Sequence, residues 1–494
     1  MRRSRLVTLA VAGLTAASAT ALSLSEPVLA APSAAPVWGP CPDAGPGPNP
    51  PQCADIRVPL SWADPRGRTI TLRLSRLPAL DQEHRLGSLL VNFGGPGGPG
   101  AELIAEAGRA IMPSPLQNRF DIIGFDPRGV GASTAVKCDE PGLSAKVPAF
   151  PNSSAQFASV RRQSRTYGTS CIKNSAPGLI ANVDTVSAAR DMDAIRTALN
   201  EKKVSYLGLS YGTYLGSTYA RLFPQRISTM VLDGAMDHAV SPRDFLYDEA
   251  SALSDVFGRF AAWCSASTSC ALHGQDVVKV WDDLVARAAR TPIPAPKATG
   301  GATTVDDQAI QLVLPNLLLI SSSTVIPSTW PLLGDGIARA RAGDASVLAD
   351  NSAIGQTQDS YAAIGCQSFP PQLRGYADAA SRLAHARAIA PHTGGASEAW
   401  MLTDLCASWP VPASDPWAPQ RITGTPPILI TSTRYDPSTP LVWAEGLHRE
   451  IPGSHLLVAD IAGHTTFLNS ACARTEQTNY LITGVLPTTS TCGA

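Results

Sequence analysis

Apolar and polar positions change their pattern along this chain, and the changes predict strands and helices. Residues 69–74 alternate apolar and polar side chains, as an antiparallel strand with one wet face does. Four short apolar runs without alternation, typical of buried parallel strands, lie at 88–93, 121–125, 204–208 and 229–232. Segments with helical periodicity lie between them, at 101–111, 184–199 and 211–223. This order predicts a doubly wound α/β fold with a mostly parallel sheet.

The alternation of strands and helices is interrupted in the second half of the chain. From residue 239 to about 415 the chain has helical spacing and no comparable series of strands. Strands resume at 428–431 and 456–459, with a helix near 441–449 between them. We therefore predict one α/β domain in two pieces, residues 31–238 and 416–494, with a helical cap inserted at 239–415.

The first thirty residues have the features of an export signal. Arg2, Arg3 and Arg5 precede an apolar run at 6–22, and small residues at 28–30 suit a signal peptidase. The run is shorter than the roughly 20 apolar residues that span a membrane. Residues 1–30 are thus predicted to be a cleaved signal peptide, which makes the mature protein secreted and without a membrane anchor.

Export changes the interpretation of the ten cysteines, because thiols outside a reducing cytosol form disulfides more often than metal sites. No cysteine or histidine spacing typical of zinc occurs, so we expect no metal. The cysteines fall into sequence neighbours, which suggests local pairs: Cys41 with Cys53, Cys138 with Cys171, Cys264 with Cys270, Cys366 with Cys406, and Cys472 with Cys492.

Charge and composition exclude some classes of protein. Charged residues are 16% and apolar residues 44% of the 494, which excludes a disordered chain. A net charge of −1 gives no electrostatic footprint for nucleic acid. We expect a monomer with no cofactor and no nucleic-acid or membrane partner.

A serine nucleophile is predicted at the end of the third buried strand. Residues 208–212 read Gly-Leu-Ser-Tyr-Gly, between a predicted strand and a predicted helix. The two glycines allow the tight turn that lifts a serine Oγ above the carboxyl edge of the sheet. Ser210 is therefore the predicted nucleophile.

A nucleophilic serine needs a base and an orienting acid, which follow it in the order Asp, His in this kind of fold. Asp436 comes just after the strand at 428–431, and His464 just after the strand at 456–459. Both fall at the edge where Ser210 is expected, so Asp436 and His464 complete a predicted triad. His448 and His455 compete for the base, but they fall within a helix and at the start of a strand.

The glycine-rich run at 93–100 supplies the third requirement, an oxyanion hole. Its backbone is predicted to donate the Gly95 N–H, together with the N–H of Tyr211 after the nucleophile. The run also satisfies a dinucleotide-binding pattern, which we reject because its prolines lack the N–H groups that hold a pyrophosphate. Arg128, after the second strand, is interpreted as a structural anchor.

Taken together, these motifs resemble the secreted tripeptidyl aminopeptidases of actinomycetes, α/β-hydrolase serine peptidases related to proline iminopeptidases. The resemblance is carried by FGGPGG at 93–98, FDPRG at 125–129, GLSYGT at 208–213, LDG at 232–234, TWPL at 329–332 and YDP at 435–437. It implies the α/β-hydrolase fold, the triad Ser210, Asp436 and His464, a helical cap over the site, and peptide substrates cleaved into short units from free N-termini.

An aminopeptidase must also bind the ammonium of its substrate, normally with a carboxylate. Many larger relatives have an acid two residues after the cap cysteine, where this chain has Ser368. Carboxylates in or beside the cap are the candidates: Asp237, Asp248, Glu249, Asp306, Asp307 and Asp359. A secreted carboxylesterase, an iminopeptidase-like hydrolase and an inactive binding protein are the alternative functions.

Overall fold

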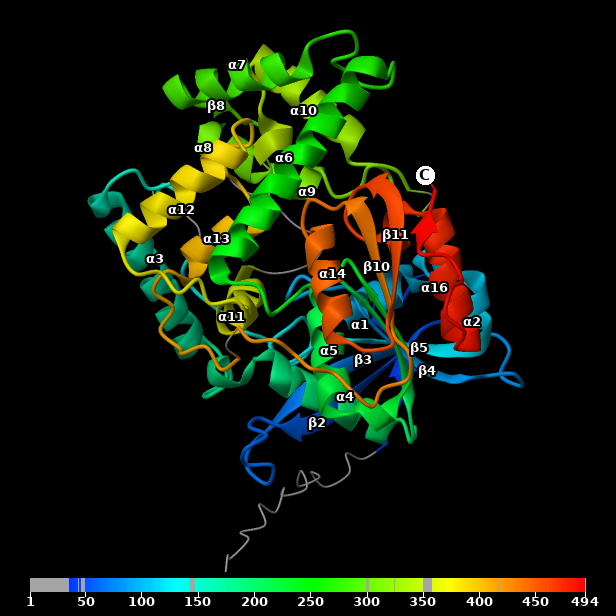
Figure 1. Cartoon of the computed structure of the whole chain (residues 1–494). Coiled ribbons are helices and arrows are strands. Elements are labelled where there is room, and N and C mark those ends of the chain that lie inside the picture. The colour runs from blue at the N-terminus through cyan, green and yellow to red at the C-terminus, as the bar shows by residue number, and fades with distance from the viewer. Residues whose placement is uncertain are drawn as a thin grey trace, which may run out of the picture.

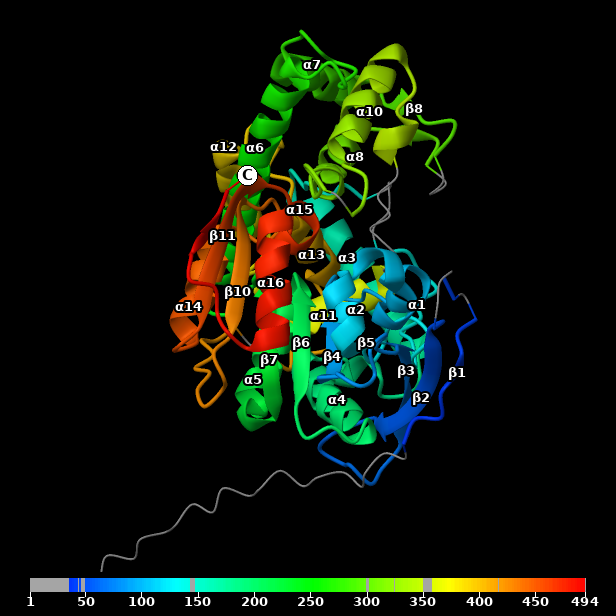
Figure 2. The same ribbon diagram turned by 90° about the vertical axis from the view of Figure 1, so that its right-hand side faces the viewer.

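A computed structural model describes residues 35–493, except 43, 46–48, 143–146, 299–301, 324, 350–357 and 416. The predicted signal peptide at 1–30 lies outside the described residues. Figures 1 and 2 show an α/β body with a helical extension above it.

The centre of the body is one ten-stranded sheet in the order β1-β2-β3-β5-β4-β6-β7-β10-β11-β12. From β5 to β12 neighbouring strands are parallel, whereas β1, β2 and β3 form an antiparallel edge. The predicted mostly parallel α/β-hydrolase sheet is thus confirmed. The strands are β1 (Gly39–Pro40), β2 (Gln52–Pro59), β3 (Thr69–Leu77), β4 (Gly87–Asn92), β5 (Phe120–Phe125), β6 (Val204–Leu209), β7 (Ile227–Asp233), β10 (Leu429–Tyr435), β11 (His455–Ala462) and β12 (Thr491–Cys492).

Helices cover both faces of this sheet, which is why its central strands are apolar throughout. One face carries α1 (Gly100–Ile111), α2 (Ser114–Arg119) and α16 (Ala471–Thr483), whose apolar side chains share one cluster. The other face packs against α4 (Thr185–Ala198), α5 (Tyr211–Leu222) and α14 (Leu441–Glu450). The predicted helices therefore form the two outer layers around the sheet.

The elements between β7 and β10 are helices and one short hairpin. The helices are α6 (Pro242–Ala266), α7 (Val277–Arg290), α8 (Asp307–Leu312), α9 (Leu314–Leu317), α10 (Trp330–Ala342), α11 (Gln358–Ser368), α12 (Tyr376–Ile389) and α13 (Glu398–Cys406). The hairpin pairs β8 (Ile293–Pro294) with β9 (Thr304–Val305). The apolar pattern of the sequence did not predict it.

This helical insertion packs in two parts. The distal end of α6 and helices α7 to α10 bury an apolar cluster of their own, at the top of Figure 1. Helices α11 and α13 instead join the main apolar cluster of the body, together with α3 (Ser154–Asn174). The second part is therefore fixed to the sheet, where it can supply walls for a site.

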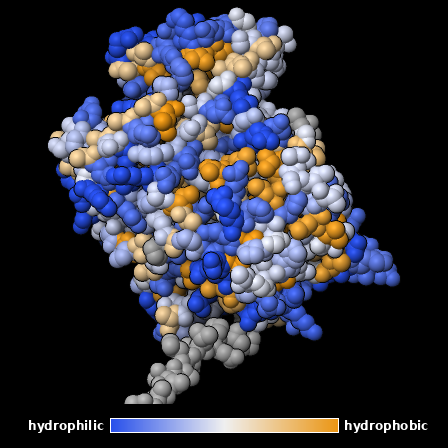
Figure 3. All heavy atoms as spheres, in the orientation of Figure 1, coloured by the Kyte–Doolittle hydropathy of each residue, from blue (hydrophilic) through white to orange (hydrophobic). Residues whose placement is uncertain are grey.

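All five predicted disulfides form, and no cysteine of the described chain is free. Five disulfides point to an oxidising, extracellular environment. Within the described residues no helix has both the length and the apolar character needed to cross a membrane. The face seen in Figure 3 is mostly hydrophilic, and its apolar side chains form separate patches.

Arg128 is a structural anchor, as its place after a strand suggested. Its guanidinium is fully buried and donates to both carboxylate oxygens of Asp191, at 2.7 and 2.6 Å. Its remaining N–H groups donate to the carbonyls of Pro59, Leu60 and Asn182. It therefore joins β2, α4 and the loop after β5.

We predict that Arg128→Ala destabilises the fold by about 3–5 kcal/mol, because it leaves the Asp191 charge buried without a partner. Urea unfolding followed by far-UV circular dichroism measures the change. Lys279→Ala is the control, since Lys279 pairs with Asp283 in solvent and such exposed pairs contribute little to stability. Equal losses from both variants would contradict the prediction.

Candidate active site

Ser210 occupies the sharp turn between β6 and α5. Its φ of 57° and ψ of −126° are a strained combination for a residue with a side chain. The turn needs its flanking glycines. A Cβ on Gly208 would lie 2.4 Å from the Gly212 carbonyl oxygen, and a Cβ on Gly212 would lie 2.6 Å from the Asn92 carbonyl oxygen. The backbone N–H of Ser210 donates to the Asp233 carbonyl at 2.9 Å. The turn places Ser210 at the carboxyl edge of the sheet, as predicted.

Asp436 and His464 are in direct contact. The Nδ1 atom of His464 lies 2.9 and 3.0 Å from the two carboxylate oxygens of Asp436. The buried carboxylate also accepts the N–H groups of Ser438, Thr439 and Thr465 at 2.8–3.2 Å. An acceptor this well fixed keeps the proton on Nδ1 and leaves Nε2 as the basic nitrogen.

Residues 233 and 234 bring Ser210 and His464 to the same place. Asp233 holds the backbone of Ser210, and a Cβ on the next residue, Gly234, would lie 3.3 Å from Cε1 of His464. The alternative bases lie elsewhere: His448 pairs with Ser454, and the His455 ring contacts the Thr489 carbonyl. Of the three histidines considered, only His464 lies at this edge.

The electrostatic environment of His464 favours its protonated form. Burial lowers the pKa of His464, but the charge and hydrogen bond of Asp436 raise it, and Glu398 and Asp233 raise it further. The net result is a pKa above the ordinary histidine value. Such an imidazole accepts a proton from a serine more readily than an isolated one does.

The glycine loop after β4 lies against the nucleophile turn. A Cβ on Gly94 would lie 2.8 Å from the Ser210 Cβ and 3.1 Å from the Tyr211 nitrogen. Gly95, with a φ of 113°, lines the same pocket as Ser210. Neither Gly95 nor Tyr211 donates its N–H to an acceptor in the described part of the chain. Both predicted oxyanion donors are thus free to serve a ligand.

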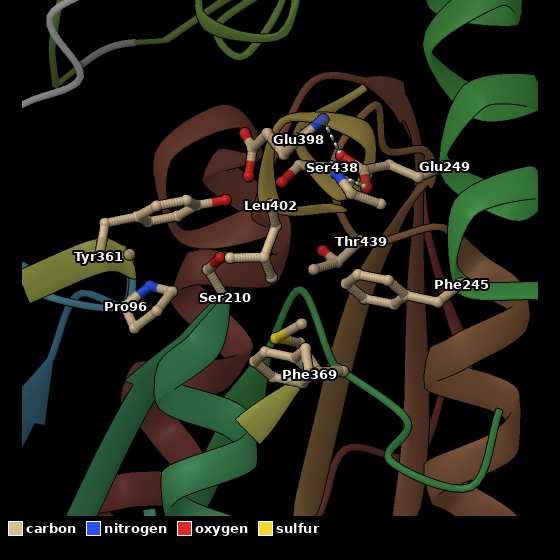
Figure 4. Close-up of a pocket in the computed structure, with 13 residues that line it drawn as sticks. Pro96, Ser210, Phe245, Glu249, Tyr361, Phe369, Glu398, Leu402, Ser438 and Thr439 are labelled. Carbon is tan, nitrogen blue, oxygen red and sulfur yellow. Dashed lines mark hydrogen bonds between the residues drawn. The ribbon is translucent and has the colours of Figure 1, made fainter. Parts of the chain in front are cut away.

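A cavity opens above Ser210 (Figure 4). The body supplies the glycine loop and the nucleophile, and the inserted helices supply most of the remaining walls. Its lining consists of Gly95, Pro96, Ser210, Met236, Phe245, Glu249, Tyr361, Phe369, Glu398, Ala399, Leu402, Ser438 and Thr439. The cavity is therefore largely apolar, with polar groups at Ser210 and around two glutamates.

The two glutamates come from different inserted helices and meet at one end of the pocket. Glu249, on α6, is only 2% exposed and accepts the N–H groups of Glu398 and Ala399 at 2.9 and 2.8 Å. Burial raises the pKa of Glu249 well above the usual range, and the charge of Glu398 adds to the effect. Burial also raises the pKa of Glu398, partly offset by His464 and Ser438. A positive charge beside these two carboxyl groups would therefore stabilise their ionised forms.

Of the six candidate carboxylates in or beside the cap, only Glu249 lines the pocket. Four of the others bind the protein itself: Asp237 accepts the Ala239 N–H, Asp248 the Trp443 indole, Asp306 the Ala309 N–H, and Asp359 the Cys138 N–H. Glu398 was missed, because an acid after Ser397 reads as an ordinary helix start. The described residues contain no cluster of His, Cys, Asp or Glu able to hold a metal.

The sequence has clear relatives. Residues 88–301 match the alpha/beta hydrolase fold family and residues 391–492 the TAP-like protein family. Serine protease Hip1 of Mycobacterium tuberculosis is 31% identical, over 94% of this chain and 91% of its own. Tripeptidyl aminopeptidase of Streptomyces lividans is 31% identical, over 88% of this chain and 82% of its own. Carboxylesterase B of M. tuberculosis is 32% identical, over 89% of this chain and 85% of its own.

We predict that Glu398→Gln moves the acid limb of the pH profile of kcat/KM to lower pH. Glu398 raises the pKa of His464, and removal of its charge lets the imidazole stay neutral in more acidic solution. The profile is measured with an uncharged short acyl ester. Glu249→Gln is the comparison: Glu249 is not among the charges that raise the pKa of His464, so we expect the acid limb to stay in place. The same downward movement in both variants would contradict the assignment.

Proposed function

Because the chain belongs to the TAP-like family of serine hydrolases with the α/β-hydrolase fold, we propose that it is a secreted serine exopeptidase. It releases tripeptides, or similarly short units, from the free N-termini of peptides. The observation that carries this proposal is the pair Glu249 and Glu398 in the same pocket as Ser210. Secretion is supported by the predicted signal at 1–30 and by the five disulfides.

The proposed chemistry uses Ser210, His464 and Asp436 as a triad. The Ser210 Oγ attacks the scissile carbonyl carbon while its proton passes to Nε2 of His464, and Asp436 stabilises the imidazolium. The N–H groups of Gly95 and Tyr211 bind the oxyanion. His464 then gives its proton to the departing amine, which leaves an ester on Ser210. Water, deprotonated by His464, then attacks the ester carbonyl. His464 returns the proton to the Ser210 Oγ as the peptide leaves with a free carboxylate.

The glutamate pair gives this chemistry its preference for a free N-terminus. Burial raises the pKa of both carboxylates, and the charge of Glu398 raises the pKa of Glu249 further. A substrate ammonium placed between them relieves the repulsion and supplies the hydrogen-bond donors that buried carboxylates need. A blocked N-terminus offers neither gain, so a blocked peptide binds more weakly.

The length of the released unit follows from the distance between the glutamate pair and Ser210. An extended peptide advances about 3.3–3.6 Å per residue, so each added residue moves the scissile carbonyl by that amount. The relative from S. lividans, named for tripeptide release, favours three residues. A series of substrates with one, two and three residues before the scissile bond tests the length directly.

A carboxylesterase is the second candidate function. Its support is the apolar part of the pocket wall, formed by Met236, Phe245, Phe369 and Leu402, and the carboxylesterase B relative. An acyl chain could fill this wall without using the glutamates. The two functions therefore differ in whether Glu249 and Glu398 contribute to substrate binding.

We predict that Glu398→Gln and Glu249→Gln each raise KM for free tripeptide p-nitroanilides by about 10–100-fold, because a hydrogen bond to a charged group is worth about 1.5–3 kcal/mol. The KM for a short p-nitrophenyl ester changes little. Steady-state kinetics on free and N-acetylated tripeptide anilides measures both effects. Wild type prefers the free peptide, and Ser210→Ala hydrolyses none of them.

Asp248→Asn is the matched control for this experiment. Asp248 precedes Glu249 on α6 and is half-buried, but its carboxylate binds the Trp443 indole outside the pocket lining. Its substitution leaves the KM for free tripeptides unchanged. Cleavage of the ester alone by wild type would select the esterase, and equal rates on free and blocked peptides would refute the ammonium anchor.

A further inference from the structure

The loop that carries His464 is held from outside the body by a segment of the insertion. Residues 319–321, just after α9, form what we call the cap strap. The Leu319 carbonyl accepts the backbone N–H of His464 at 2.7 Å, and the Ser321 hydroxyl donates to the Ala462 carbonyl at 2.5 Å. The strap therefore contacts the backbone on both sides of Gly463, directly before the imidazole.

Asn469, in the short helix α15 (Thr466–Asn469), binds the strap and the His464 loop together. Its Nδ2 donates to three backbone carbonyls, those of His464 at 2.7 Å, Thr465 at 3.1 Å and Leu319 at 3.3 Å. Its Oδ1 accepts the Ser321 N–H at 3.1 Å. The side chain is 6% exposed. Only an amide offers donors to the carbonyls and an acceptor to the strap at once.

The loop has a backbone that this packing must hold. Thr465 has a φ of 64°, which is unfavourable for a β-branched residue. Gly463 has a φ of 114°, and a Cβ there would lie 2.5 Å from the Asn469 Oδ1 and 2.9 Å from the Leu319 oxygen. Strained residues persist only where the surroundings fix them. Here the strap and Asn469 do so on one side.

The body holds the other side of the same loop. The Asp233 carboxylate accepts the N–H groups of Thr466 and Phe467 at 2.9 and 2.7 Å. Among the described residues, the backbone of His464 hydrogen-bonds only to Leu319, whose carbonyl accepts the His464 N–H, and to Asn469, whose amide donates to the His464 carbonyl. The orientation of its ring toward Asp436 thus depends on a contact that crosses from the insertion to the body.

We propose that Asn469 is a positioning residue for His464, and that the cap strap completes the catalytic centre by binding it. The inference rests on the proposed catalytic role of His464. Without the Asn469 amide, the loop relaxes from its strained backbone and the imidazole turns away from Asp436. Two effects follow: the proton transfer is misaligned, and the carboxylate no longer raises the pKa of His464 as strongly.

The test compares Asn469→Ala and Asn469→Asp with wild type on a short p-nitrophenyl ester. We expect kcat to fall about 10–100-fold, as for a misplaced catalytic group, with KM nearly unchanged because Asn469 does not line the pocket. In Asn469→Ala the acid limb of kcat/KM moves to lower pH. Asn469→Asp is as impaired as Asn469→Ala, since it places an oxygen against three carbonyls.

Ser470→Ala is the matched control. Ser470 follows Asn469 and caps α16 through the Ala473 N–H, without contact to the strap. It lowers stability while kcat and the acid limb stay at their wild-type values. Ser321→Ala, which removes only the hydroxyl bond to Ala462, gives a smaller loss of kcat in the same direction. If the Asn469 variants do not fold, Ser321→Ala still tests whether the cap strap positions His464, because Ser321 belongs to the strap.

Several outcomes overturn the proposal. If folded Asn469 variants keep kcat within twofold of wild type and their acid limb does not move, the role of Asn469 is purely structural. If no Asn469 variant folds, an unchanged kcat in Ser321→Ala leads to the same conclusion. A rise in KM alone would place Asn469 in substrate binding. Activity in His464→Ala would refute the triad and this inference with it. Activity lost in His464→Ala but kept in the Asn469 variants would refute this inference alone.

Discussion

The last residue of β7, Asp233, holds the nucleophile and the base in one frame. Its carbonyl accepts the Ser210 N–H, and its buried carboxylate accepts the N–H groups of Thr466 and Phe467, just beyond His464. Two turns that lie more than 250 positions apart in the sequence are thereby bound to a single residue. Burial raises the pKa of Asp233, but these N–H groups oppose the rise by stabilising the charged form. In each of these contacts Asp233 binds a backbone N–H group, so the frame depends on Asp233 itself and not on the side chains of Ser210 and Phe467.

Negative charge is concentrated around one imidazole in this site. Asp436, Glu398 and Asp233 all raise the pKa of His464 against the effect of its burial. The same charges affect one another, because Glu398 raises the pKa of Glu249. A site of this kind gains by binding a cation, and a peptide N-terminus is a cation of suitable size. The electrostatics of His464 and the proposed preference for a free N-terminus therefore have a common origin.

The sequence was most informative where a short segment determines its own structure. The strand pattern, the turn at Ser210 and the neighbouring cysteine pairs all depend on local spacing. Glu398 and Asn469 could not be found in this way. Their roles depend on contacts with Glu249 and the cap strap, which are about 150 positions away and lack a local signal.

The place of the insertion explains how the inserted helices can supply half of the site. The chain leaves the body just after β7, beside Asp233, and returns just before β10, which leads to Asp436. The exit lies at the carboxyl edge of the sheet, whereas the chain returns at the amino end of the parallel neighbour β10, where the Gly424 carbonyl accepts the Gln225 side chain. The insertion therefore lies over Ser210 from the start, and its sequence can change the pocket while the parallel strands continue to fix the triad. In this protein the insertion contributes both the charged end of the pocket and the strap on the His464 loop. Substrate choice and the alignment of the base thus depend on the same docked helices.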